Sequence, residues 1–453
     1  MESVEDFLGI IGGYVWGPPL LVLIVGTGIY LTVRLGVLQI RLLPYALKLT
    51  FTKNKNKDDK GDISHFQALS TAMAATVGTG NIVGVATAVV LGGPGAIFWM
   101  WISAFFGMAT KYGEAVLAVK YRITDSNGRM AGGPMYYLEH GLKQKWLAVL
   151  FAIFGSIAAF GIGNGTQSNS VASIVDDTFN VAPWITGIIL TIFAALVILG
   201  GITTIGKVTA FFVPIMVLFY VAAGLVVMVL NFELIPTAVG VIMNAAFTGE
   251  AAAGGAIGAA IRYGVSRGVF SNEAGLGSAP IAAAAAKTDM PGRQALVSMT
   301  QVFFDTLIVC SITGITIVMS GLYLDGDLQG APLTSAAFGQ FLGGAGPYIV
   351  AIGLIFFASS TIIGWSYYGE KCFQYLFKSP SLLIVYRVVF VSVVFIGATV
   401  SLDVVWSFSD VMNGLMAIPN LIGLLGLSGV IVYETKKIIA KIKEEKEAER
   451  AGN

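Results

Sequence analysis

The sequence predicts an all-α polytopic membrane protein, and this prediction depends on its composition, its many apolar segments and the placement of its charges. Of the 453 residues, 56% are apolar and only 12% are charged, and the mean hydropathy is +0.80. Soluble domains carry about 25% charged residues, so a water-soluble fold could not bury this much apolar surface. The net charge of +1 also excludes a broad nucleic-acid-binding surface as the main role of the chain.

Eleven segments are long and apolar enough to cross a lipid bilayer, which takes about 20 residues. They run over residues 15–37, 66–91, 96–120, 147–172, 183–201, 208–231, 254–286, 294–322, 346–376, 382–400 and 407–433. The shorter apolar stretch 236–247 is predicted to be a helix at the outer surface, and the charged tail 434–453 an interfacial or solvated cytoplasmic helix. Two cysteines, both in apolar segments, make neither a disulfide framework nor a metal cluster.

Basic residues occur in alternate loops between these spans. The loop after the first span contains Arg41, Lys48, Lys53, Lys55, Lys57 and Lys60. The loops without lysine or arginine carry Asp176, Asp177, Glu233, Asp325, Asp327 and Asp403 instead. Because cytoplasmic loops are enriched in basic residues, we expect a multi-pass protein of the cell membrane with its N-terminus outside and its C-terminus in the cytoplasm.

The spans after the first one form a repeat. Their starts at residues 96, 147, 183 and 208 recur at 294, 346, 382 and 407, with offsets of 198 to 199 residues. This divides the chain into an extra N-terminal helix with a basic loop, two five-helix repeats and a tail, at residues 1–65, 66–231, 232–433 and 434–453. Five spans is an odd number, so the second repeat is predicted to be inverted relative to the first.

Each repeat opens with a span that glycine interrupts, at 78–81 in the first and at 271–280 in the second. Glycine in a helix interior costs roughly 1 kcal/mol relative to alanine. Irregular backbone at membrane depth is tolerated only where it is buried in protein or lines a cavity. There, the N-terminal ends of half-helices attract an anion such as a carboxylate, and free carbonyls can hold sodium. The pattern is typical of secondary transporters, although small residues also let membrane helices pack closely.

Polar side chains in two other spans are candidates for the same site. Asn164 and Gln167 are three residues apart and share one helix face, so their amides could bind an amino acid or hydrogen-bond a neighbouring helix. Ser360 and Thr361 could complete an oxygen cage for sodium, or bond back to carbonyls of their own helix. Trp365 with Ile362 or Ile363 could form the apolar lid of a small pocket, although a tryptophan at this place could also serve ordinary packing.

Ionisable residues at membrane depth are functional candidates by default. We expect Arg262 and Arg267 to neutralise Glu273 and Asp305 and so to pin the second break; the alternative gives Glu273 a coupling-ion or proton role. Lys111 and Glu114 are expected to form a structural pair near the cytoplasmic end of their span. The sequence contains no G-x-S-x-G elbow, H-E-x-x-H motif or P-loop, so neither an enzyme nor an ATP-driven pump is predicted.

Three segments resemble one family. GGPGAIFWMWISAFFG (92–107), GVFSNEAGLGSAP (268–280) and ATVGTGNI (75–82) are similar to blocks of the alanine or glycine:cation symporters. These belong to the amino acid–polyamine–organocation superfamily, which has the LeuT-like fold. The resemblance implies a 5+5 inverted repeat with one extra N-terminal helix, and sodium- or proton-coupled uptake of alanine or glycine by alternating access.

The resemblance also implies a site. With the polar candidates above, the expected substrate-binding residues are Thr79, Gly80, Asn81, Asn164, Gln167, Asn272, Gly275, Ile363 and Trp365. The expected sodium ligands are the backbone near Ala75 and Gly78 with Ser360 and Thr361. No cofactor is expected besides the coupling ion. We expect the protein to be a monomer in the lipid bilayer. A channel is the less favoured alternative to a transporter.

Overall fold

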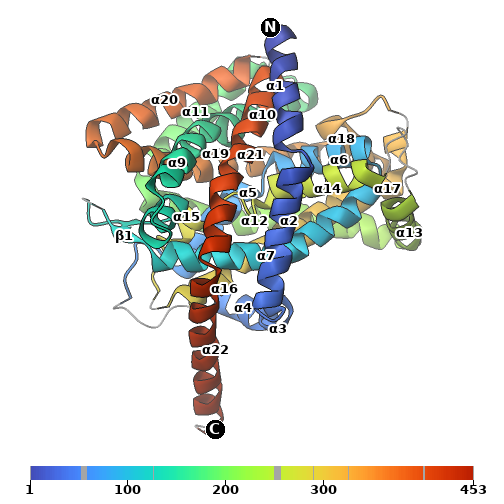
Figure 1. Ribbon diagram of the computed structural model, residues 1–453. Coiled ribbons are helices and arrows are strands. Elements are labelled where there is room, and N and C mark those ends of the chain that lie inside the picture. Colours follow the sequence, from blue (N-terminus) through green and yellow to red (C-terminus); the bar gives the residue numbers. More distant parts are fainter. Residues whose placement is uncertain are drawn as a thin grey trace.

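The computed structural model describes residues 2–52, 59–125, 127–248, 257–288, 290–324, 326–400 and 403–451. This part of the chain is almost entirely helical. Lys53, Lys55, Lys57 and Asp325, which the sequence places in loops, lie outside the described residues. The first helix, α1 (Glu2–Val15), and the last, α22 (Ser428–Ala451), place the two termini at opposite ends of the molecule (Figure 1).

The helices follow the predicted spans in order. They are α2 (Pro18–Arg34); α5 (His65–Thr76), η1 (Gly80–Gly84) and α6 (Val85–Gly92); α7 (Gly95–Lys120); α9 (Lys145–Phe160), η3 (Gly161–Gly165) and α10 (Thr166–Phe179); α11 (Pro183–Ile198); α12 (Gly201–Leu230); α14 (Ile257–Asn272) and α15 (Pro280–Ala283); α16 (Pro291–Val302), η4 (Phe303–Cys310) and α17 (Ser311–Ser320); α19 (Ala345–Phe377); α20 (Pro380–Thr399); and α21 (Asp403–Gly426).

The chain is a multi-pass membrane protein by the length and surface of its helices. Six helices in the described residues are long and apolar enough to cross a membrane, or up to eight if each of two bent pairs is one span. The remaining predicted spans fall short of this criterion; α11, for example, has 16 residues. Helices α11, α12 and α20 expose large apolar side chains, including Leu196, Phe211 and Ile384, which is the surface that lipid tails would contact.

The segments between the spans contain further structure. The predicted outer helix over 236–247 is α13 (Leu234–Thr248). The stretch 323–345, predicted as a loop, instead contains α18 (Gly330–Leu342), because its apolar residues Leu333 and Phe338 are buried against the bundle. The smaller elements are α3 (Leu38–Arg41), α4 (Leu43–Thr50), the antiparallel pair β1 (Ile123–Thr124) and β2 (Met130–Ala131), α8 (Pro134–Tyr136), η2 (Tyr137–Gly141) and η5 (Leu322–Leu324).

The last predicted span ends earlier than expected. Helix α21 stops at Gly426, and the chain bends by 63° into α22, which projects away from the bundle (Figure 1). The tail helix therefore begins at Ser428 rather than after residue 433. Its start is held against the bundle by the buried residues Ile431 and Ile438, and further along by an ion pair of 2.6 Å between Arg293 and Glu445.

The two glycine-interrupted spans are broken as predicted. Between α5 and η1 the chain bends by 53°. After α14 the backbone enters the left-handed region at Glu273 (φ +57°), Gly275 (φ +96°) and Gly277 (φ +83°). Glycine adopts such angles without the steric cost that a side chain brings, so Gly275 and Gly277 are well suited to this backbone. Glu273 is held there against its preference.

Helix α19 runs unbroken past the first break and η3, and it approaches both closely. A Cβ atom at Gly163 would lie 2.2 Å from Cβ of Trp365, and one at Gly364 would lie 2.7 Å from Ala75. Only glycine fits at these two contacts, so α19 can bring its own polar side chains within hydrogen-bonding distance of the broken helix.

Backbone hydrogen bonds tie the chain before α5 to the chain after α15. Asp62 N and Ile63 N donate to the carbonyl of Ala285 at 2.8 and 3.2 Å, and Lys287 N donates to the carbonyl of Ile63 at 2.7 Å. The start of the first broken span is therefore joined directly to the end of the second, next to the basic loops.

Arg122, just after α7, holds this junction together. Its guanidinium group donates to four backbone carbonyls, those of Lys60, Ala284, Ala286 and Thr288, at 2.7 to 3.3 Å. The planar, five-donor shape of arginine suits such a set of acceptors.

Replacing Arg122 with alanine should lower the free energy of unfolding by about 1–3 kcal/mol, because buried carbonyls lose their donor. Arg122→Lys should recover little of this stability, since three donors on one atom cannot reach all four carbonyls. Thermal unfolding of the purified protein, followed by size-exclusion fluorescence, measures both. A midpoint in Arg122→Ala equal to that of the wild type would contradict this account.

Candidate functional site

The first break is held by its own asparagine. Gly78 N donates to Asn81 Oδ1 at 2.9 Å, and Asn81 N donates to the carbonyl of Gly78 at 3.2 Å. The Asn81 side chain is fully buried, and its Nδ2 donates to Asp305 Oδ1 at 2.8 Å. Asn81 therefore satisfies the backbone of the break and links it to η4.

Gln167 reaches the same break from α10. Its Nε2 donates to Thr79 Oγ1 at 3.0 Å and to the carbonyl of Ile162 at 2.9 Å. Its Oε1 accepts from Thr79 N at 3.3 Å. The structure thus brings together Gln167 and Thr79, two of the predicted substrate-binding residues.

Hydroxyl groups of α19 face carbonyls at the end of α5. Ser360 Oγ donates to the carbonyl of Ala74 at 3.2 Å, and Thr361 Oγ1 lies 3.5 Å from that of Val77. Each hydroxyl has one hydrogen, and the carbonyl of Phe357 on their own helix competes for it at 2.8 and 3.0 Å, which is the alternative weighed from sequence. The carbonyls that face the hydroxyls are those one residue before the expected Ala75 and Gly78.

The second break is held by a buried carboxylate from another helix. Glu114 Oε1, on α7, accepts from Gly275 N at 3.0 Å, Gly277 N at 3.1 Å and Asn420 Nδ2 at 2.7 Å. Asn420 also donates to the carbonyl of Gly275 at 2.8 Å. The backbone N–H and C=O groups of Gly275 are therefore both hydrogen-bonded to side chains, from α7 and α21 respectively.

Lys111 belongs to the same arrangement. Its Nζ lies 3.6 Å from Glu114 Oε2 and donates to the carbonyl of Glu273 at 2.9 Å. The predicted Lys111–Glu114 pair is present, but it holds the second break instead of serving only its own helix. The sequence did contain a signal for this role, because two opposite charges lie three residues apart inside an apolar span of 26 residues.

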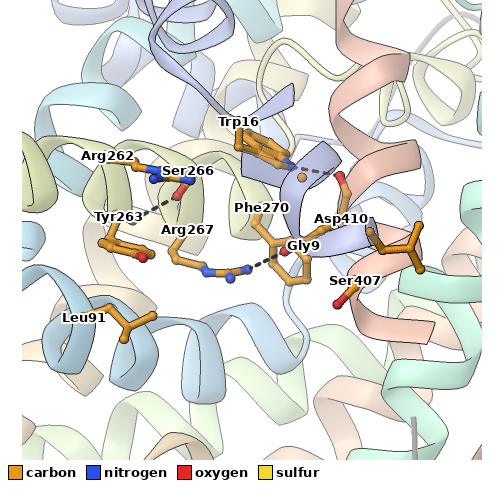
Figure 2. Close-up of a pocket in the computed structure, with 12 residues that line it drawn as sticks. Gly9, Trp16, Leu91, Arg262, Tyr263, Ser266, Arg267, Phe270, Ser407 and Asp410 are labelled. Atoms are coloured by element: carbon orange, nitrogen blue, oxygen red, sulfur yellow. Dashed lines mark hydrogen bonds and ion pairs between the residues drawn. The ribbon is translucent and has the colours of Figure 1, made fainter. Parts of the chain in front are cut away.

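The expected neutralisation of Glu273 and Asp305 by two arginines is wrong. Arg267 pairs with Asp410 on α21 at 3.4 Å, beside a surface cavity of about 220 Å³ that Arg262 also lines (Figure 2). Glu273 accepts from Ser278 Oγ at 2.5 Å instead. The arginines precede the break by at least one helical turn, and the Arg267 side chain extends toward α21.

The remaining predicted residues occupy different surroundings. Asn272 caps the second break, since its Oδ1 accepts from Ala274 N at 2.9 Å. A Cβ atom at Gly80 would lie 3.0 Å from Cα of Ser271, so the two breaks touch there. Ile363 and Trp365 are buried. Asn164 donates to the carbonyl of Phe390 on α20 at 2.6 Å, so in this structure its amide is directed away from the first break.

Three π-helical segments, η1, η3 and η4, surround the breaks, as is common where helices carry functional groups. Among the described residues, no group of three or more histidine, cysteine, aspartate or glutamate side chains could hold a metal ion. The oxygen atoms around Ser360 and Thr361, by contrast, suit a hard monovalent cation, because carbonyls of unwound helices and half-helix C-termini coordinate sodium in transporters.

The chain belongs to the sodium:alanine symporter family, whose sequence pattern it matches over residues 1–451. It is 61% identical to the sodium/alanine symporter AgcS of Methanococcus maripaludis, over 95% of this chain and 97% of that protein. It is 38% identical to the probable sodium/glutamine symporter GlnT of Bacillus subtilis, over 96% and 91% of the two chains. It is also 37% identical to the putative sodium/proton-dependent alanine carrier protein YrbD of that organism, over 94% and 90%.

Replacing Glu114 with alanine should destabilise the protein by about 3–5 kcal/mol, because Lys111 loses its buried partner and two backbone N–H groups lose their acceptor. Glu114→Gln should be milder, since its carbonyl oxygen can still accept from the break. Thermal unfolding midpoints of the two variants make the comparison. Equal midpoints in Glu114→Ala and the wild type would show that the break does not depend on this carboxylate.

Proposed function

We propose that this chain is a secondary transporter that takes up alanine and glycine together with sodium by alternating access. Its fold would be the LeuT-like 5+5 inverted repeat, with one extra N-terminal helix. The observation that carries the proposal is the placement of the Ser360 and Thr361 hydroxyls of an unbroken helix against carbonyls of a broken one. The 61% identity to the sodium/alanine symporter AgcS of Methanococcus maripaludis supports it.

The proposed sodium site lies between α5 and α19. Its oxygen atoms are the carbonyls of Ala74 and Val77 and the hydroxyls of Ser360 and Thr361, with Ala75 and Gly78 beside them. The C-terminal end of the half-helix α5 carries partial negative charge, which favours a cation there. The hydroxyl hydrogens already point to carbonyls, including that of Phe357, and need only turn aside to offer lone pairs.

The proposed site for the substrate carboxylate is the start of η1, at Thr79, Gly80 and Asn81. The N-terminal end of a half-helix favours an anion. At present Thr79 N is satisfied by Gln167 Oε1, so a substrate carboxylate would replace this amide oxygen as the acceptor. We assign the opposite wall to Asn272 and Gly275 of the second break.

Apolar side chains limit the size of the proposed pocket. Trp365 packs directly on Gly163, and Gly80 lies against Ser271. Trp365 also interacts with the side chain of Glu273. We assign Ile363, on the same buried helix, and Asn164, within η3, to the same wall, and we infer that a pocket bounded in this way admits a methyl group but not a branched or aromatic side chain.

The membrane arrangement follows the predicted repeats, 66–231 and 232–433, with the tail helix in the cytoplasm and the N-terminus outside. Termini at opposite ends of the molecule support an odd number of crossings (Figure 1). We propose that the protein acts as a monomer in the cell membrane.

Proton coupling is the second candidate. Glu273 is buried at the second break and accepts a hydrogen bond from a hydroxyl group, and one relative, YrbD, is described as a putative sodium/proton-dependent alanine carrier protein. Alanine uptake into proteoliposomes under separately imposed sodium and proton gradients distinguishes the two: the proposal expects uptake with sodium alone. Exchange of labelled for unlabelled alanine across the membrane further distinguishes a transporter from a channel, which only equilibrates it.

The double variant Ser360→Ala, Thr361→Ala should bind alanine weakly and without dependence on sodium. Sodium and substrate share one broken helix, so each should raise the affinity of the other by the same factor, typically 5–150-fold. Calorimetric titration with alanine in sodium chloride and in choline chloride gives this factor. Glu273→Gln serves as the comparison, and a full sodium response in the double variant would transfer the coupling role to Glu273.

Competition among amino acids should follow side-chain size. Glycine should displace labelled alanine, whereas leucine and phenylalanine should not, because Trp365 closes the pocket. Truncating this residue, as in Trp365→Ala, should admit leucine. Displacement of alanine by leucine in the wild type would show that Trp365 does not limit the size of the pocket.

A further inference from the structure

Helix α4 has a hollow on each of two sides, at the end of the molecule from which α22 projects (Figure 1). The first is a cavity of about 400 Å³ that α16 and α22 complete. Its residues from α4 and the turn after it follow the i, i+3, i+4, i+7 spacing of one helix face and are Tyr45, Lys48, Leu49 and Thr52. The second is a groove of about 170 Å³ against α5 and α12, lined instead by Thr50 and Phe51.

The cavity is basic. Besides Lys48 it is lined by Arg293, Glu445 and Lys446. Arg293 and Glu445 form an ion pair of 2.6 Å, so their charges offset each other. Lys48 and Lys446 are exposed, and within the described ranges neither has an acidic partner. Two ammonium groups beside one cavity attract an anion such as phosphate, on which lysine acts as a point charge.

The groove is apolar. Its wall includes Phe66 and Met73 of α5 and Val217 and Leu218 of α12. From Phe66 to Met73 the groove extends about 10 Å along the helix, at 1.5 Å per residue. Phe51 and Leu218 remain 69% and 67% exposed, so the groove opens onto the surface that lipid tails would contact. A hydrocarbon chain suits these walls, whereas a polar ligand would lose its hydration there.

The position of the two hollows matches the two ends of a lipid. The cavity lies beside the tail helix α22, on the proposed cytoplasmic side, and the groove continues along α5 into the membrane-spanning part. Basic pockets between helices on the cytoplasmic side bind acidic lipid head groups. A free phosphate ion would account for the cavity but not for the groove, and an uncharged lipid would account for the groove but not for the unpaired lysines.

We propose that α4 holds an anionic phospholipid, with its phosphate between Lys48 and Lys446 and one acyl chain in the groove lined by Phe66 and Val217. Such a lipid joins the tail helix α22 to α5, the half-helix that ends at the first break. The inference is independent of the proposed transport of alanine, and its test uses no amino acid.

The test measures lipid binding to the purified full-length protein in detergent by native mass spectrometry. Phosphatidylglycerol and phosphatidylcholine with identical acyl chains are titrated separately, so the two lipids differ only in the head group. The variant Lys48→Ala, Lys446→Ala removes both ammonium groups. Lys437→Ala, Lys443→Ala is its matched control, because it removes the same charge from α22 without altering the lining of the cavity.

A second pair of variants tests the groove. Val217→Trp fills it, and Leu225→Trp places the same side chain at an exposed position of α12 that does not line the groove. Should Val217→Trp not give a monodisperse protein, Leu218→Trp, at an exposed position of the same groove, replaces it. In a third arm, inorganic phosphate and phosphatidylglycerol are compared by the thermal stabilisation that each gives to the wild type.

We expect the wild type to bind phosphatidylglycerol at least tenfold more tightly than phosphatidylcholine. The Lys48, Lys446 variant should lose about tenfold or more of that affinity, since each basic residue near an anionic lipid contributes about fivefold. Val217→Trp should weaken the binding of phosphatidylglycerol, whereas both control variants should bind it like the wild type.

The proposal is overturned if the two lipids bind equally, or if the control pair of lysines matters as much as Lys48 and Lys446, since binding would then follow the overall charge of the protein. It is also overturned if inorganic phosphate stabilises the protein as much as phosphatidylglycerol does, or if filling the groove leaves the affinity unchanged. The occupant would then be a small anion in the cavity alone.

Discussion

The bilayer core contains no water, so every backbone group that a broken helix frees must find a partner inside the protein. This constraint organises the structure around the two breaks. At the first, Asn81 and Gln167 supply the partners; at the second, Glu114 and Asn420 do. The helices that carry these side chains are held in place by the same hydrogen bonds that make the breaks tolerable.

Helix α7 shows how a charged pair can lie inside an apolar span. Lys111 and Glu114 are buried, and burying an ion pair is favourable only where further hydrogen bonds satisfy its members. Glu114 gains three donors and Lys111 gains a carbonyl acceptor, all at the second break or on α21. Asn420 in turn accepts from the hydroxyl of Tyr137, which extends the support to η2. The charge pair is thus the means by which an unbroken helix holds a broken one.

The sequence predicted the features that depend on local chemistry. Glycine clusters predicted both breaks, and the spacing of polar residues predicted that Gln167, Ser360 and Thr361 face inward. It did not predict partners across helices: Glu114 on the second break, Arg267 on Asp410, or the carbonyls of Ala74 and Val77 in place of their neighbours. Periodicity along one helix identifies a face, whereas the partner depends on the rotation and depth of another helix, which one sequence does not reveal. The stretch 323–345 was missed as a helix because its glycines and short length resemble a loop.

The two breaks touch each other and share a hydrogen-bonding partner. Gly80 lies against Ser271, and donors from both breaks end on Asp305. A shift of Asn81 would alter its hydrogen bond to this carboxylate, and with it the environment of Ser271 and Thr306 on the other side. Coupling between sites requires a shared element whose state both ligands change, and it is reciprocal. In this protein the hydrogen-bonded junction at Asp305 contacts both breaks, so a change in the position of one break alters the hydrogen bonds of the other.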